Sequence, residues 1–462
     1  MKVRITPIGA AGTVTGSMYL FEYKGHKFLI EAGMFQGHLE PLNYEDFPFD
    51  PKEIEFIILS HPHLDHIGLL PKLVREGFSG EVIATPATRD IASIMLLDAA
   101  HLQEEDWKIE HRKALRRGEE IPEILYDVQD ATMAMHRFGR TVSYEGKFEP
   151  FDGVSFWFRD AGHVLGSAFL EIDFDGTKVV FSGDLGHKGK PIIRDPERIA
   201  TRDVDLLIIE STYGKRDHRS VEESVQELKE AIQRTIERGG NVLIPSFSLE
   251  RAQDILFYLR EFYEQGELPP NARVFLDSPL AISATQIFRA HPECFDEETL
   301  ELVRSGIDPF LFPGVRFTRS VDESKRINDI RSGAIIIAGS GMCTGGRIKH
   351  HLKHNLWRPE CSVIFVGYQA HGTLGRRIVD GAKEVTIYGE RIAVQAEIYT
   401  INGFSGHAGR SGLLEWADGV QGKHRALVVH GEPEESQSLA DGLRSLGFED
   451  VQVAERLKPI EV

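Results

Sequence analysis

Apolar and polar residues alternate with a period of two near the start of the chain. This alternation predicts strands at residues 3–8, 18–23 and 27–30, joined as a meander. Residues 53–59 end instead in an almost continuous apolar run, which is typical of a strand buried on both faces. Similar segments predict strands at residues 81–85, 154–159, 169–174, 178–181 and 204–210. The first part of the chain is therefore expected to be rich in β-sheet.

The pattern changes after residue 211. Apolar residues from Val221 to Ile236 recur at helical spacing, and Gly239 supplies a stop signal for that helix. Predicted strands then alternate with predicted helices, which indicates a parallel α/β unit. These strands are expected at residues 241–245, 273–276, 334–338 and 362–366.

Strands predicted at 396–400, 425–429 and 451–454 return to the first pattern. We therefore expect a first domain made of residues 1–211 and 391–462. A second domain, residues 212–390, is expected to be inserted within it.

Composition suits an acidic globular protein of the cytoplasm. Of the 462 residues, 41% are hydrophobic and 27% charged, and the formal net charge is −18. The whole surface is therefore not expected to attract nucleic acid. Three cysteines without a Cys-x-x-Cys pair argue against a disulfide framework. The start of the chain lacks the apolar run of a signal peptide, and no stretch has the length of a membrane-spanning helix, so we expect no membrane association.

Four potential metal ligands lie on the turn between the strand at 53–59 and a predicted helix. They are His61, His63, Asp65 and His66. His61 and His63 are two residues apart, so in an extended backbone they point to the same side and could bind one ion. Asp65 and His66 follow as the chain turns and could bind a second ion. Imidazole and carboxylate without thiolate suit Zn²⁺, and also Mn²⁺ or Fe²⁺; a His-rich surface loop is the alternative.

Further acids and histidines stand where other predicted strands end. Asp184 follows a buried strand and is well placed to bridge two metals with its two carboxylate oxygens. Glu31, at the end of the third strand, could orient a metal-bound histidine without being a ligand. The remaining residues of this kind are His163, Glu210, His407 and His430.

These motifs together resemble the β-CASP branch of the metallo-β-lactamase superfamily. The resemblance lies in His-Pro-His-Leu-Asp-His at 61–66, with His163 and Asp184. It extends to Glu210 in Glu-Ser-Thr-Tyr-Gly, His407 in Gly-Phe-Ser-Gly-His-Ala and His430 in Val-Val-His-Gly-Glu. It implies an α/β fold, namely an αββα sandwich of two mixed sheets with an inserted parallel α/β β-CASP domain. Glu31 departs from the aspartate usual in that family, and His371 from a glutamate frequent in its prokaryotic members.

The resemblance also implies two Zn²⁺ ions and a ligand set. His61, His63 and His163 would bind one ion. Asp65, His66 and His430 would bind the other, and Asp184 would bridge them. The implied activity is that of a ribonuclease in which a metal-activated hydroxide leaves 5′-phosphate and 3′-hydroxyl ends. Asp65 and Asp184 would take part in catalysis, His407 would donate a proton to the leaving oxygen, and Glu210 would hold His407.

In an acidic protein, the phosphates of a nucleic-acid substrate need a binding site of their own. Residues 340–347 follow a predicted strand and precede a helix, so the amides of Gly345 and Gly346 could receive a phosphate. Ser246 follows another strand. The candidate cations are Arg251, Arg347 and Arg376, for each of which a surface ion pair is the alternative.

The expected partner is single-stranded RNA, and three other functions compete with the ribonuclease. A DNA nuclease of the same branch is disfavoured because His430 stands where DNA-acting members typically have valine. A catalytically silent RNA-binding scaffold is disfavoured because all seven ligand positions are retained. A small-molecule hydrolase would not need the inserted domain. Internal or terminal cleavage, and a homodimer, stay open.

Overall fold

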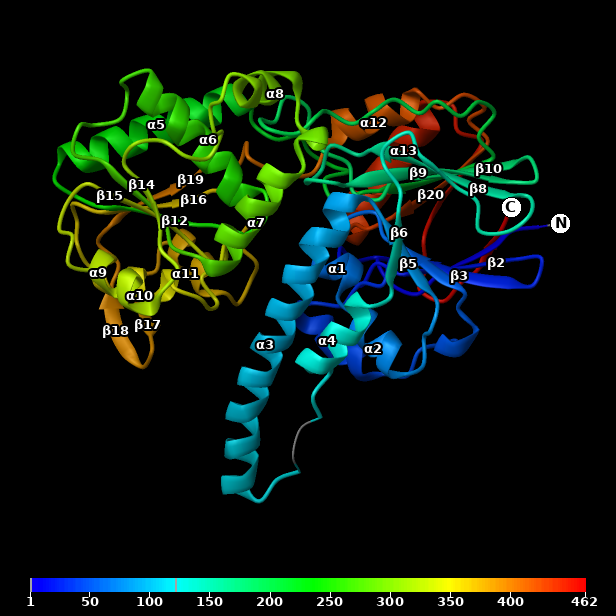
Figure 1. Cartoon of the computed structure of the whole chain (residues 1–462), viewed down its shortest axis with the longest axis horizontal. Coiled ribbons are helices and arrows are strands. Elements are labelled where there is room, and N and C mark those ends of the chain that lie inside the picture. The colour runs from blue at the N-terminus through cyan, green and yellow to red at the C-terminus, as the bar shows by residue number, and fades with distance from the viewer. Residues whose placement is uncertain (1, 121–122) are drawn as a thin grey trace. The chain divides into compact units, whose positions relative to one another are not determined.

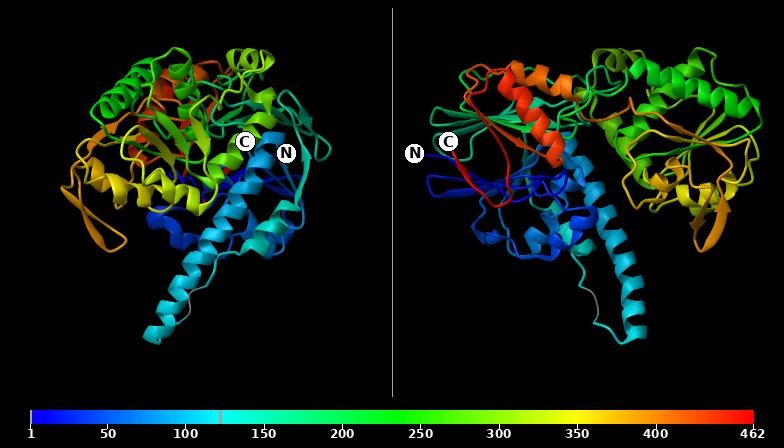
Figure 2. Two further views of the ribbon diagram at one scale, coloured as in Figure 1. Left: turned by 60° about the vertical axis from the view of Figure 1, so that its left-hand side comes forward. Right: turned by 180° about the vertical axis from the view of Figure 1, so that it is seen from behind.

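The computed structural model describes residues 2–120 and 123–462. The chain forms two compact units. One comprises Met1–Lys188, Asp195–Asp217 and His407–Val462, and the other comprises Gly189–Arg194 and His218–Gly406. Figure 1 shows the chain coloured from its N-terminus to its C-terminus, and Figure 2 shows it from two further sides.

Two mixed seven-stranded sheets form the centre of the first unit. The order in one sheet is β22 (Ile460–Glu461), β1 (Arg4–Pro7), β2 (Tyr19–Tyr23), β3 (His26–Ile30), β4 (Phe56–Ile58), β5 (Glu81–Ala84), β6 (Phe138–Thr141). The order in the other is β21 (Asp450–Val453), β20 (Arg425–Val429), β11 (Leu206–Glu210), β10 (Thr177–Phe181), β9 (Ala168–Phe174), β8 (Val154–Asp160), β7 (Lys147–Phe148). The sequence predicted most of these strands to within a few residues.

Helices cover the outer face of each sheet, so the unit has four layers (Figure 1). Those on the first sheet are α2 (Leu70–Arg75), α3 (Pro86–Arg117) and α4 (Val128–Met135). Those on the second are α12 (Arg410–Asp418) and α13 (Pro433–Ser445). Phenylalanines such as Phe28, Phe56 and Phe156 stack between the two sheets. This arrangement is the αββα sandwich expected from the sequence.

Helix α3 is much longer than the sheet that it covers. Its first turns are buried, with Thr85 as the N-terminal cap, whereas most side chains beyond residue 101 are exposed. Both figures show this second half extending away from the sheets of its unit. The second half of α3, from residue 101 onward, is therefore a charged and largely solvated segment. Among the described residues, no helix combines the length and the apolar character needed to cross a membrane.

The second unit is built on a six-stranded sheet in which every pair is parallel. Its order is β14 (Val315–Phe317), β13 (Arg273–Leu276), β15 (Ala334–Ala338), β12 (Val242–Pro245), β16 (Ser362–Phe365), β19 (Glu397–Thr400). The helices are α5 (Val221–Glu237), α6 (Arg251–Glu264), α7 (Pro279–Ala290), α8 (Glu297–Arg304), α9 (Val321–Ile327), α10 (Ile348–Asn355) and α11 (Leu374–Val379). A small hairpin, β17 (Glu384–Ile387) with β18 (Glu390–Ala393), completes the unit. This is the parallel α/β unit expected from the sequence.

The boundary between the units differs from the expected one at its C-terminal side. The sequence placed residues 391–406 with the first domain, yet β19 pairs with β16 from Ser362↔Glu397 to Phe365↔Thr400. These main-chain hydrogen bonds keep the segment in the inserted unit as far as Gly406. Gly189–Arg194 also belongs to that unit, because Ile193 forms a bridge with Phe295.

Candidate metal centre

Seven acids and histidines that lie far apart in the sequence come together in the first unit. They lie where four strands end, after β4, β8, β10 and β20. The turn after β4 carries His61 to His66, with Asp65 and His66 on the short helix α1 (Leu64–Ile67). The loop between β8 and β9 carries His163, Asp184 lies on the loop after β10, and His430 directly follows β20. All seven ligand positions predicted from the sequence therefore meet at one place.

Glycines allow the close backbone approaches that this meeting requires. A Cβ atom added to Gly33 would lie 1.7 Å from the carbonyl oxygen of Asp65, and one added to Gly186 would lie 1.7 Å from that of Gly162. His430 itself has a left-handed backbone, with φ 49°. Such a conformation in a non-glycine residue is strained and is found most often at functional sites.

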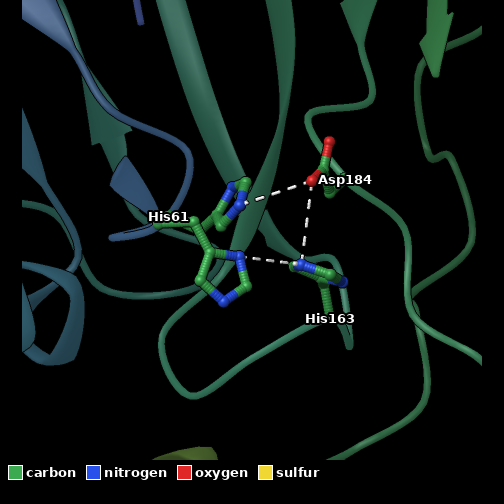
Figure 3. Close-up of side chains that lie close together, drawn as sticks. His61, His163 and Asp184 are labelled. Atoms are coloured by element: carbon green, nitrogen blue, oxygen red, sulfur yellow. Dashed lines mark hydrogen bonds and ion pairs between the residues drawn. The ribbon is translucent and has the colours of Figure 1, made fainter. Parts of the chain in front are cut away.

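Asp184 lies at the middle of the cluster, and its carboxylate contacts histidines on both sides of it. Oδ2 lies 3.4 Å from His61 Nε2 and 3.7 Å from His163 Nε2, contacts that Figure 3 marks with dashed lines. Oδ2 also lies 3.3 Å from His66 Nε2, and Oδ1 lies 3.6 Å from His430 Nδ1. His63 completes the first side, because its Nδ1 is 3.2 Å from His163 Nε2.

The second side of the cluster consists of Asp65, His66 and His430. Asp65 Oδ2 lies 3.4 Å from His430 Nε2 and 3.7 Å from His66 Nε2, and the two histidine Nε2 atoms are 3.3 Å apart. Ligand atoms of these three residues lie within 4.8 Å of one another, as do those of His61, His63, His163 and Asp184. The cluster thus contains two groups with the spacing of metal sites.

Burial and neighbouring charge set the protonation of these groups. Burial raises the pKa of Asp184, but His430, His66 and His61 outweigh it and hold that pKa well below its usual range. Burial lowers the pKa of His63 to about 4 and that of His61 well below its usual value. Asp184 is therefore an ionised carboxylate, and His61 and His63 are neutral imidazoles, which are the forms that bind metals. Burial lowers the pKa of His66, but Asp184 and Asp65 outweigh it and raise that pKa well above its usual value.

Some buried polar atoms of the cluster form no hydrogen bond within the part of the chain that the structure describes. His61 Nε2 and Asp184 Oδ1 are buried, and neither forms a hydrogen bond with any described residue. An unpaired buried lone pair is costly unless something else satisfies it. The donor set, which is imidazole and carboxylate without thiolate, suits Zn²⁺ and similar divalent ions. The residues present therefore fit a metal centre.

Glu31 and Ser60 support the ligands from outside the set. The carboxylate of Glu31 accepts the Ser60 N–H at 3.2 and 3.3 Å and lies 3.5 Å from His66 Nδ1. Ser60 Oγ lies 2.9 Å from His61 Nδ1. The extra methylene of the glutamate therefore still allows a contact with the far side of the His66 ring.

His407 and Glu210 form a pair beside the cluster. His407 Nδ1 lies 3.2 Å from Glu210 Oε1 and 3.9 Å from Asp184 Oδ2. Glu210 is fully buried and also accepts the Leu185 N–H at 2.8 Å. Burial lowers the pKa of His407, but the Glu210 carboxylate outweighs it and raises the pKa to about 9. An imidazole in this state carries a proton at neutral pH and can give it away.

Family models match almost the whole chain. The metallo-beta-lactamase superfamily matches residues 11–238, the Beta-Casp domain residues 252–378, and the Zn-dependent metallo-hydrolase RNA specificity domain residues 391–454. Ribonuclease TTHA0252 of Thermus thermophilus is 40% identical over 97% of both chains. The chain belongs to the β-CASP branch of the metallo-β-lactamase superfamily. It is thus a member of a family of metal-dependent hydrolases, as the sequence motifs indicated.

Two further comparisons concern more distant proteins. Transcription termination factor FttA of Methanocaldococcus jannaschii is 32% identical over 100% of this chain and 72% of its own length. A crystal structure of a protein of unknown function from Enterococcus faecalis covers 100% of both chains with a TM-score of 0.57. At 13% identity this last likeness concerns the fold alone.

The three arginines predicted to bind substrate, all in the inserted unit, each form an ion pair with a carboxylate of the protein. Arg251 is buried and pairs with Asp254 at 3.0 Å, and Arg376 pairs with Asp380 at 2.9 Å. Arg347 reaches the buried Asp277 at 2.7 Å. The ion-pair alternative thus describes all three side chains as they stand.

The three uncharged candidates of the same group differ in exposure. Ser246 is buried, and its hydroxyl donates to the Phe247 carbonyl at 3.0 Å. Gly345 and Gly346 lie on the accessible loop between β15 and α10. On α10, which follows this loop, His351 is buried and its Nε2 lies 2.6 Å from Asp277 Oδ2, whereas His350 and His354 are exposed. Among these candidates, the glycine loop is the part still open to a ligand.

Two residues that support ligands of the metal centre were not singled out from the sequence. Thr212 Oγ1 lies 3.1 Å from His430 Nδ1, and Ser60 holds His61 in the same way. Partners of this kind fix the ring orientation of a histidine ligand. Adjacency was the available signal, because Ser60 precedes His61 and Thr212 follows Glu210 by two residues.

Proposed function

We propose that this chain is a zinc-dependent ribonuclease that hydrolyses the phosphodiester bonds of single-stranded RNA. The observation that carries the proposal is the complete set of seven ligand residues, arranged as two groups around Asp184. The 40% identity with a ribonuclease over 97% of both chains supports RNA as the substrate, as does the match to an RNA specificity domain. The proposal keeps the cytoplasmic location expected from the sequence.

The proposal assigns the ligands to two Zn²⁺ ions. His61, His63 and His163 would hold one ion, and Asp65, His66 and His430 the other. Asp184 would contact both, which agrees with the contacts of its carboxylate to His61 in one group and to His66 and His430 in the other. When bound, such ions act as Lewis acids that neutralise phosphate charge and make water a nucleophile at neutral pH.

Two residues of the chain, His407 and Glu210, would supply a proton to the leaving group. Protonated His407 donates to the 3′-oxygen as the P–O bond breaks, which leaves 3′-hydroxyl and 5′-phosphate ends. Glu210, at 3.2 Å, keeps the imidazole protonated before the reaction and fixes which ring nitrogen faces the substrate. Because Glu210 is buried and also bonded to the Leu185 amide, it cannot turn away.

The competing functions are less well supported. A silent scaffold has no use for buried ligand atoms that form no hydrogen bond with any described residue, such as His61 Nε2 and Asp184 Oδ1. A DNA nuclease remains the alternative within the branch, and His430 argues against it by resemblance. A direct comparison of RNA and DNA separates these two polymers as substrates.

The test uses purified protein with end-labelled single-stranded RNA and matched DNA, with and without a chelator. Asp65→Ala removes a proposed ligand, and Asp441→Ala, on the exposed face of α13, serves as a matched control. The expected result is RNA cleavage that requires metal and is lost in Asp65→Ala but kept in Asp441→Ala. Metal analysis should find two zinc ions per wild-type chain.

The cleavage products answer two further questions. A ladder of internal products indicates an endonuclease, and progressive shortening from one end indicates an exonuclease. End-group analysis should find 5′-phosphates. If the zinc-loaded protein cuts neither polymer, or cuts only DNA, the ribonuclease proposal is wrong.

A further inference from the structure

The carboxyl ends of the parallel strands in the second unit bring together aromatic and hydroxyl side chains that the proposed chemistry does not use. Phe247 follows β12, and Tyr368 follows β16, its neighbour in the sheet. Both rings are exposed, Phe247 to 42% and Tyr368 to 54%. In parallel α/β sheets this edge is where ligands bind. Exposed aromatic rings at such an edge are available to stack against a ligand.

The ring of Phe247 is held in place by two glycine loops. A Cβ atom added to Gly341 would lie 2.9 Å from ring atoms Cδ2 and Cε2, and one added to Gly367 would lie 3.2 Å from Cε2. One side of the ring therefore packs directly on backbone. The Gln369 amide ties both loops together, because its Nε2 donates to the carbonyls of Gly341 and Gly367 at 2.9 and 3.0 Å. The exposed part of the ring is thus a rigid surface, which lowers the entropy cost of stacking on it.

Hydroxyl and amide groups lie directly beside the ring. Gly341 continues the loop from Ser340, whose Oγ is 3.2 Å from Thr344 Oγ1 and accepts the Gly345 N–H at 3.2 Å. Thr344 and Gly346 are exposed. Ser248 and Ser278, from the ends of β12 and β13, approach each other to 3.3 Å near Gly339. These donors are uncharged, which suits phosphate oxygens in an acidic protein without attracting every anion.

An aromatic surface beside hydroxyl and amide donors matches the two parts of a nucleotide. Single-stranded RNA offers unstacked bases, which stack on Phe or Tyr, and phosphates, which accept hydrogen bonds. We propose that Phe247 is a stacking platform for one unpaired base of the RNA, whose adjoining phosphate lies on residues 340–346. This inference rests on the proposed function and adds a base-binding site to it. Stacking tolerates any base, so the platform positions the strand without selecting a sequence.

Binding assays with modified RNA can test the platform. The Asp65→Ala background prevents cleavage, and fluorescence anisotropy measures the affinity for a labelled single-stranded RNA. Phe247→Leu keeps apolar volume but removes the ring, and should weaken binding about tenfold. Phe247→Trp keeps a stacking surface and should restore it. Trp357→Leu is the matched control, since it removes an aromatic residue of the same unit that is 52% exposed and follows α10.

Abasic nucleotides distinguish stacking from a structural role of Phe247. An abasic ribose is placed at each position of the RNA in turn. With Phe247 present, one position should be sensitive and should lose about tenfold in affinity. In Phe247→Leu that same position should become insensitive, because the base has lost its platform.

The outcomes separate the platform from the proposed function. If Phe247→Leu and wild type bind RNA equally tightly and cut it equally well, the platform is wrong and the ribonuclease stands. Equal losses for intact and abasic RNA in Phe247→Leu would also overturn it, since they indicate misfolding or a phosphate effect. A wild-type protein that neither binds nor cuts RNA would overturn both.

Discussion

Glu31 shows how a single side chain can support a metal ligand that it does not join. It has a left-handed backbone, φ 66°, at the end of β3, which turns its carboxylate toward the cluster. Burial raises its pKa, and His66 and Ser60 oppose that rise. The carboxylate thus remains available to hold the His66 ring from its far side.

Replacement of Glu31 by glutamine should weaken metal binding. Glu31→Gln keeps the shape and an acceptor for the Ser60 N–H, but removes the negative charge 3.5 Å from His66 Nδ1. We expect the affinity for one zinc ion to fall about 10- to 100-fold, the usual effect of losing such a partner. Competition with a chromophoric chelator measures the zinc affinity of each variant. Glu55→Gln, at an exposed carboxylate, is the control, and unchanged affinity in Glu31→Gln would contradict the role.

The proposed role of His407 as proton donor can be tested with two substrates whose leaving groups differ in their need for a proton. His407→Gln should lower the rate of RNA cleavage about 10²- to 10⁴-fold, since an alkoxide leaves slowly without a proton. Hydrolysis of bis(p-nitrophenyl) phosphate should change little, because nitrophenolate leaves without one. The zinc content should match that of wild type. Equal rate losses on both substrates would argue instead for a structural role.

At the scale of elements, Asp277 joins four parts of the second unit. It follows β13 and accepts hydrogen bonds from Ser324 on α9 and from Thr318 after β14, both at 2.6 Å. His351 on α10 lies 2.6 Å from it, and Arg347 pairs with it at 2.7 Å. Burial raises the pKa of Asp277, but these partners outweigh it and lower the pKa to about 2, against an ordinary 3.8.

This network should make the second unit sensitive to acid. Because the folded pKa lies below the unfolded one, Asp277 contributes stability above about pH 4 and loses it as the pH falls toward about 2. The shift corresponds to about 2 kcal/mol. Asp277→Asn should therefore lower the free energy of unfolding by about that amount at pH 7, and the difference should narrow below pH 4.

Urea unfolding of both proteins at a series of pH values measures the effect of Asp277→Asn. Asp329→Asn removes an exposed carboxylate of the same unit and is the control. A difference that stays constant down to the lowest pH would show that the charge of Asp277 is not what stabilises the network.

The Asp277 network is an example of contacts that the sequence could not predict. His61 to His66 lie on one turn, so their spacing alone predicted a metal site. Asp277 and His351 are 74 residues apart, and nothing local links them. Arg347 accordingly suggested a phosphate ligand, although its charge is used within the fold. The C-terminal boundary was misplaced for a similar reason, because whether residues 397–400 pair with β16 depends on the sheet and not on their own pattern.

At the scale of the whole molecule, the two units follow one structural rule. In each, candidate functional groups stand at the carboxyl ends of parallel strands, where backbone groups left free by the sheet and turning loops converge. In the first unit these ends carry Asp184, Glu210 and His430. In the second they carry Phe247 and the loop at 340–346. The chemistry and the proposed base platform therefore depend on different sheets and different cores.

Separate cores predict separate responses to metal removal. All proposed ligands belong to the first unit, so a chelator should destabilise that unit and leave the second unchanged. Calorimetry of the full chain should show two transitions, of which one moves down by about 5–10 °C when zinc is removed. The fragment of residues 218–406, which contains the six-stranded sheet, identifies the transition that stays. A single transition that moves as a whole would show that the two units unfold together, and that the insertion is energetically part of the metal-binding domain.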